Sequence, residues 1–173
     1  MENSIAYPQK VDVLKIFVTG DQKVGKAAFI KCVVFGAYDP YLESALQLDF
    51  MTREIKVEEE LVVVQLWKTE PPSYHCAIVI YDVTNRSSFA YALKKLEYIR
   101  QQRSNDLPVL LLANKIDTDK KRQVMLHEGE LAALQHCALF NEISCTEATN
   151  TRESLTLFIG SLLSLNNELF SEE

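Results

Sequence analysis

The chain has 173 residues, of which 47% are hydrophobic and 24% are charged, a composition that excludes a disordered or fibrous protein and suits one domain. Its formal charge of −6 offers no general attraction to nucleic-acid phosphates or anionic lipid, so we expect no nucleic-acid partner. No apolar run approaches the roughly 18 residues of a membrane span, and residues 1–10 lack the apolar core of a signal peptide. We therefore expect a soluble cytoplasmic protein.

The N-terminal half predicts a strand, a loop, a helix and a hairpin. Val11 to Thr19 is an apolar strand, and Ala27 to Phe35 can form a helix soon after it. Leu46 to Lys56 and Leu61 to Trp67 are strand-like and are separated by a charged stretch that suits a hairpin connection. The first of these two strands alternates, whereas the second starts with four apolar residues and is expected to be buried.

The C-terminal half alternates strands with helices. Consecutive apolar residues predict buried strands, and apolar residues repeating every three or four positions predict helices. This alternation predicts an α/β fold with a mostly parallel six-stranded sheet, one antiparallel hairpin and helices on both faces. We expect the domain to span residues 11–166, after an N-terminal extension (1–10) and before a short acidic tail (167–173). The expected elements are strand Ala77 to Tyr81, helix Ser87 to Gln102, strand Val109 to Ala113, helix Glu128 to His136, strand Leu139 to Ile143 and helix Arg152 to Asn166.

The cysteines and histidines show no metal-site spacing. No C-x-x-C pair occurs, and the histidines lack the i, i+4 spacing of a helical metal pair, so we expect no metal site of this kind. The cysteines lie in apolar segments, which predicts buried free thiols. They are Cys32, Cys76, Cys137 and Cys145.

A glycine-rich segment between the first strand and the first helix predicts a phosphate-binding loop. The segment is Gly20-Asp21-Gln22-Lys23-Val24-Gly25-Lys26. In a G-x-x-x-x-G-K loop the glycines allow close approach, backbone N–H groups cradle phosphate oxygens and the lysine adds a full charge. The next residue is Ala27, where this motif has a Ser or Thr whose hydroxyl binds Mg²⁺. Phosphate-loop ancestry is thus better supported than retained nucleotide binding.

A second polar segment, Asn114-Lys115-Ile116-Asp117, follows the predicted strand Val109 to Ala113 directly. A carboxylate such as Asp117 can accept hydrogen bonds from both N1–H and the 2-amino group of guanine, and adenine has neither donor there. Asn114 would tie the loop together beside the base, and the stem of Lys115 could cover the ring. Taken alone, the segment could equally be a polar exit from a strand. Together with the phosphate loop it predicts a guanine site.

With these motifs the chain resembles the Ras-like small GTPases, and among them the Rab branch most closely, from about Val11 to Leu163. The resemblance implies a P-loop small G domain with a site for GDP or GTP. It also implies that Ser144-Cys145-Thr146 matches the family's third base-contacting loop and that Tyr38 corresponds to an aromatic residue beside the base. Further matching strings are residues 81–89, Arg122-Gln123-Val124, Glu128-Gly129-Glu130 and Thr149-Asn150.

The same resemblance reveals departures at the switch regions. Both hydroxyl ligands of Mg²⁺ have become alanine, at Ala27 and Ala45, and a second register places Tyr41 at the latter position. After Trp67 the family's Asp-Thr-Ala-Gly-Gln is replaced by Lys68-Thr69-Glu70-Pro71-Pro72. The path onward to the next strand is shorter than in a typical Rab, so we expect the switch helix to be missing. We expect Mg²⁺ binding to be weak or absent.

These features predict a degenerate Rab-like domain that does not hydrolyse GTP and acts as a protein-interaction or adaptor subunit in intracellular or ciliary trafficking. One alternative is a protein that holds GDP or GTP constitutively without switching. Another is a GTPase completed by a partner. No cysteine follows Cys145, so we expect no direct lipid anchor and recruitment to membranes or the cilium through partner proteins.

Overall fold

A computed structural model of the chain describes residues 13–37, 48–103 and 106–170. The strands form one sheet in the order β2-β3-β1-β4-β5-β6, in which the β2–β3 pair is antiparallel and the other neighbours are parallel. The predicted α/β fold with one antiparallel hairpin is therefore confirmed. In chain order the elements are β1 (Leu14–Gly20), α1 (Lys26–Phe35), β2 (Phe50–Val57), β3 (Glu60–Trp67), β4 (Cys76–Asp82), α2 (Arg86–Gln102), β5 (Val109–Asn114), the 3-10 segment η2 (Ile116–Lys121), α3 (Leu126–Gln135), β6 (Leu139–Ile143) and α4 (Thr151–Phe170).

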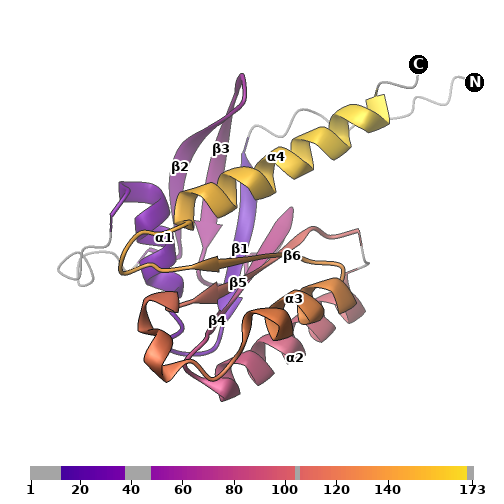
Figure 1. The fold of residues 1–173 in the computed structure, drawn as a ribbon. Helices are drawn as coiled ribbons and strands as arrows, with labels where there is room; N and C mark the ends of the chain where they lie inside the picture. Colours follow the sequence, from indigo (N-terminus) through magenta and orange to yellow (C-terminus); the bar gives the residue numbers. More distant parts are fainter. Residues whose placement is uncertain (1–12, 38–47, 104–105, 171–173) are drawn as a thin grey trace, which may run out of the picture.

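Two helical layers cover the sheet and enclose two hydrophobic cores (Figure 1). Successive residues of a strand point to opposite faces. Ile16 and Val18 of β1 therefore pack in the core with α1 and α4, while Phe17 between them packs in the core with α2 and α3. No helix within the described residues is long and apolar enough to cross a membrane.

The ends of the helices follow from local sequence. The side chain of Asn85 accepts hydrogen bonds from the backbone N–H groups of Ser87 and Ser88 and so caps the start of α2. Helix α1 ends at Gly36, whose φ of 88° lies in the left-handed region that glycine adopts most readily. Helix α4 continues to Phe170, four residues beyond the predicted end at Asn166, because no glycine or proline stops it.

Two sequence predictions about burial were wrong. Leu61 of β3 is 69% exposed, and Val62 and Val63 are only partly buried. Within the described residues, the helices that pack on the antiparallel β2–β3 pair are α1 and α4, which lie on one face of it, so its apolar residues do not require burial on both sides. Cys137 is exposed, unlike the other three cysteines, because it lies in the turn after α3 with a φ of 50°.

Residues 68–75 connect β3 to β4 without a helix, as expected. The connection is held closely to β1. The backbone N–H of His75 donates to the carbonyl of Lys15 at 2.9 Å, and the N–H of Lys15 donates to His75 Nδ1 at 2.9 Å. The ring of Tyr74 packs on Phe17 with 5.4 Å between centroids. The segment is therefore a short, tethered connection.

The packing of α3 and α4 on the sheet predicts different effects for one glycine in each helix, Gly129 in α3 and Gly160 in α4. A Cβ atom at Gly129 would lie 2.5 Å from both Phe140 and the Tyr81 hydroxyl, whereas a Cβ at Gly160 would meet Val57 at an ordinary 3.4 Å. We expect Gly129→Ala to lower the free energy of unfolding by about 1–3 kcal/mol through overpacking. Gly160→Ala should leave it unchanged or raise it by up to about 1 kcal/mol. Urea unfolding followed by circular dichroism measures both, and equal effects would contradict the packing described for α3.

Candidate functional site

The glycine-rich loop leads from β1 to α1 at the carboxyl ends of the parallel strands. Gly20 and Gly25 have φ values of 150° and 103°. A Cβ atom at Gly20 would lie 2.2 Å from the carbonyl oxygen of Ile80 on the neighbouring strand β4. Glycine is needed here because the loop must leave β1 directly against β4.

Lys26, the first residue of α1, points back across this loop. Its Nζ donates to the carbonyl oxygens of Gly20 at 2.9 Å and Asp21 at 2.5 Å. Partial burial lowers the pKa of Lys26, and the charge of Asp21 partly opposes that shift. Gln22 and Lys23 are exposed at the outer turn of the loop. The loop therefore presents one ammonium group held at its centre.

Asn114 joins three segments that are far apart in the sequence. Its side chain is buried, and its Nδ2 donates to the carbonyl of Val24 at 2.8 Å. Its Oδ1 accepts from the N–H of Lys115 at 2.8 Å and from the N–H of Cys145 at 3.2 Å. A Cβ atom at Gly25 would lie 2.3 Å from Asn114 Nδ2, so glycine there makes room for this contact.

Lys115 is fixed by a carboxylate that sequence reasoning did not assign to the site. Its Nζ lies 2.6 Å from Asp82 Oδ2 and donates to the carbonyl of Lys23 at 2.9 Å. The other oxygen of Asp82 accepts from the N–H and hydroxyl of Thr84. Burial acts to raise the pKa of Asp82, but the hydrogen bonds from Lys115 and Thr84 outweigh it and hold the pKa below its usual value. In the sequence Asp82 and Asn114 each follow a predicted strand directly, but only the strand order shows that these two strands are adjacent.

The base-reading candidates gather at the same edge of the sheet. The hydroxyl of Ser144 donates to Asp117 Oδ1 at 2.7 Å, which orients this exposed carboxylate. Cys145 is buried and Thr146 is exposed. Tyr38 and Ala45 lie outside the described residues. The structure thus brings the glycine loop, Asn114 to Asp117 and Ser144 to Cys145 together.

The protein-family model of the Ras family matches residues 15–164. The chain belongs to the Ras family of small GTPases. Membership implies a guanine-nucleotide site, and the residues present fit one. Lys26 and the N–H groups of the glycine loop would hold phosphates, while Asp117 and the stem of Lys115 would contact the base and Asn114 would hold the loop beside it.

The metal ion used by Ras-family proteins has a poorer fit. Ala27 carries no oxygen ligand, and Lys68 places a cation where a carboxylate would stand in the family's motif. Within the ranges that the structure describes, no three His, Cys, Asp or Glu side chains gather closely enough to hold a metal ion.

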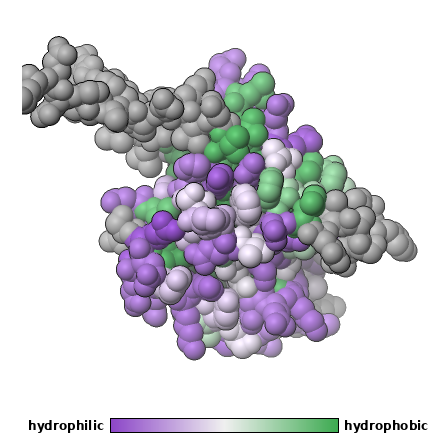
Figure 2. All heavy atoms as spheres, turned by 180° about the vertical axis from the view of Figure 1, so that it is seen from behind, coloured by the Kyte–Doolittle hydropathy of each residue, from purple (hydrophilic) through white to green (hydrophobic). Residues whose placement is uncertain are grey.

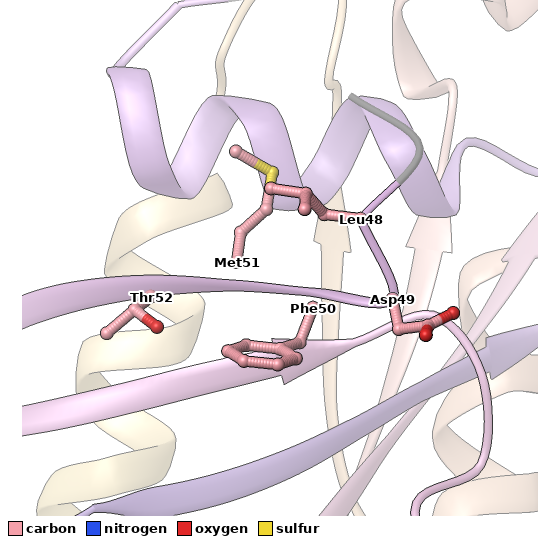
Figure 3. A pocket seen from close by; sticks show the side chains of 5 residues that line it. All are labelled: Leu48, Asp49, Phe50, Met51 and Thr52. Carbon is pink, nitrogen blue, oxygen red and sulfur yellow. The ribbon is translucent and has the colours of Figure 1, made fainter. Parts of the chain in front are cut away.

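A pocket of about 400 Å³ lies apart from these loops, at the start of β2 (Figure 3). It is lined by five consecutive residues, Leu48 to Thr52. Leu48 and Met51 point toward helix α1, while Phe50 points to the opposite face of the sheet (Figure 3). Among the residues that the structure describes, none of the predicted nucleotide contacts lines this pocket.

The Asp82 to Lys115 ion pair predicts a pH-dependent loss of stability. Asp82→Asn should lower the free energy of unfolding at pH 7 by about 1–3 kcal/mol, because it removes charge-assisted hydrogen bonds to a buried carboxylate. The folded pKa lies below the unfolded value of about 3.9, so the contribution is complete above that pH and is lost as pH falls through the folded pKa. The difference between wild type and variant should therefore shrink at acid pH. Urea titrations between neutral and acid pH measure it, with Glu97→Gln on the exposed side of α2 as the control.

Proposed function

We propose that this Ras-family domain is a degenerate, Rab-like G domain that does not hydrolyse GTP and serves as a protein-interaction or adaptor subunit. We place it in the cytoplasm, in intracellular or ciliary trafficking, with recruitment through partner proteins. The observation that carries the proposal is the connection from β3 to β4. It has eight residues, 68–75, and contains no helix.

Hydrolysis of GTP needs groups that this connection lacks. In phosphoryl transfer by G domains, a glutamine orients the attacking water and backbone donors stabilise charge on the γ-phosphate. Here the corresponding positions hold Pro71 and Pro72, and a proline has no N–H to donate. Pro71 is also buried, so it is part of the packing of this connection.

Nucleotide-driven switching is disfavoured for the same reason. A ligand shifts a conformational equilibrium only through different contacts with the two states. Neither Ala27 nor Pro71 can sense a γ-phosphate or its metal ion, so GTP and GDP would bind to one conformation. We also propose that Mg²⁺ binding is weak or absent, since Ala27 has no hydroxyl group to offer the ion.

A partly exposed aromatic pair supports a role in protein interaction. The rings of Phe50 and Trp67 stack with 4.3 Å between centroids, and the Nε1 of Trp67 donates to Gln65 Oε1 at 3.3 Å. Both lie on the β2–β3 pair, at strand positions that Rab proteins often use for effectors. Figure 2 shows hydrophobic residues gathered on this side of the molecule, over the region of the hairpin. Leu61, which is 69% exposed, lies on the same face of the pair.

A second candidate function is constitutive binding of GDP or GTP without switching. It is favoured by the base-reading side of the site, where Asn114 keeps three hydrogen bonds and Asp117 is oriented by Ser144. These contacts need no residue of the altered switch segments. The two candidates differ in whether nucleotide is retained, and both predict no turnover.

Turnover is the first test. With GTP and Mg²⁺, we expect multiple-turnover phosphate release by the wild-type protein to equal that of the Lys26→Ala variant, because the water-orienting and γ-phosphate-binding groups are missing. Release is measured with a phosphate-sensing fluorescent assay. A wild-type rate reproducibly above that of Lys26→Ala would contradict the proposal and favour an active GTPase.

Nucleotide retention is the second test. If the purified protein releases guanine nucleotide on denaturation, we expect Asp117→Ala to release at least about tenfold less, since a carboxylate with two hydrogen bonds to guanine contributes more than 1.4 kcal/mol. Chromatography of the denatured supernatant measures the amount. Glu130→Ala, which removes an exposed carboxylate from α3, is the matched control and should retain nucleotide as the wild type does. Equal retention by Asp117→Ala would show that the base lies elsewhere.

A further inference from the structure

A second pocket is built mainly from basic and polar groups. It encloses about 160 Å³ between the end of α1, strand β2 and the first turns of α4. This volume has room for about five water molecules at about 30 Å³ each, and so for a phosphate group. Its lining includes Arg53, Arg152 and Thr156.

The two arginines are anchored on neighbouring carbonyls of one helix end. Arg53 Nη1 donates to the carbonyl of Val34 at 3.0 Å, and Arg152 Nε donates to the carbonyl of Val33 at 3.1 Å. The negative end of the α1 dipole favours cations at this position. Arg152 also lies against Gly36, where a Cβ atom would come within 3.0 Å of its Nη2. Both guanidinium groups are therefore held in place before any ligand arrives.

Neither guanidinium group is neutralised within the described part of the chain. Arg86 and Arg122 each form an ion pair with a glutamate, whereas Arg53 and Arg152 form none there. Each uses one nitrogen on a carbonyl, which leaves further N–H donors for a ligand. Glu54 also lines the pocket, but as the neighbour of Arg53 on a strand it points to the opposite face of the sheet.

Thr156 adds a hydroxyl group to this pair. It follows Arg152 by four residues on α4, so the two side chains lie on the same face of the helix. No hydrogen bond of its hydroxyl occurs within the described residues. Guanidinium groups bind phosphate oxygens in parallel pairs of charge-assisted hydrogen bonds, and a hydroxyl can donate to the remaining oxygen.

We propose that Arg53, Arg152 and Thr156 form a binding site for a phosphate group, supplied as free phosphate or as the phosphate monoester of a larger molecule. The site is separate from the glycine loop, since it lies at the opposite end of α1. It therefore does not depend on whether the nucleotide site is filled.

The test follows the side-chain Nε–Hε resonances of arginine by NMR during titration of the full chain with inorganic phosphate and then with O-phosphoserine. We expect saturable shifts at Arg53 and Arg152, and an affinity at least about tenfold weaker in Arg152→Gln. Binding of both probes identifies a phosphate monoester as ligand, and binding of inorganic phosphate alone identifies free phosphate. Titration with serine should give no shift.

Three further variants keep the result decisive. Lys95→Gln removes an equal charge from α2 on the other face of the sheet and should bind phosphate as the wild type does. Thr156→Val keeps both arginine anchors, so it should fold and bind more weakly even if Arg152→Gln does not fold. Lys26→Ala removes the competing phosphate loop and should leave the shifts at Arg53 and Arg152 unchanged. Absent shifts at those two residues, or equal affinity in Thr156→Val, Arg152→Gln and Lys95→Gln, would overturn the proposal.

Discussion

The hydrogen bonds of the Asn114 side chain determine the geometry of the candidate nucleotide site. One buried amide joins the glycine loop, the base-reading loop and the segment after β6. The contacts with Val24 and Cys145 satisfy backbone groups that would otherwise be buried without a partner, which costs about 1–3 kcal/mol each. Gly25 makes the approach possible because it has no Cβ. The arrangement of these three segments therefore rests on one amide and on backbone groups.

The sequence predicted most of the fold, because its strong signals are local. Apolar runs and three- to four-residue repeats located every helix and strand that the structure describes, apart from the 3-10 segment η2. Failures occurred where tertiary context decides. The start of β3 is as apolar as a buried strand. The described helices pack on only one face of the β2–β3 hairpin, however, and Leu61 on the other face is exposed. Cys137 follows an apolar stretch, yet a turn with positive φ directs it outward.

The sequence also predicted most residues of the candidate site, with one exception. Two short sequence motifs identified four candidate site residues, Lys26, Asn114, Lys115 and Asp117. The structure places all four at one edge of the sheet. Neither motif contains Asp82, although this residue ends the strand beside Asn114 and forms an ion pair with Lys115. Motif reasoning assigns residues one segment at a time, and a partner contributed by another strand becomes visible only when the strand order is known.

The short connection between β3 and β4 also affects the thermodynamics of folding. A typical Rab has about a dozen more residues on this path, and lengthening a loop from eight to about twenty residues raises its closure entropy cost by about 0.8 kcal/mol. The eight-residue connection avoids that cost and makes the contacts of Tyr74 and His75 with β1. In the degenerate domain that we propose, the lack of a switch helix and the tight attachment of this connection to β1 would therefore have one common origin, the shortness of the connection.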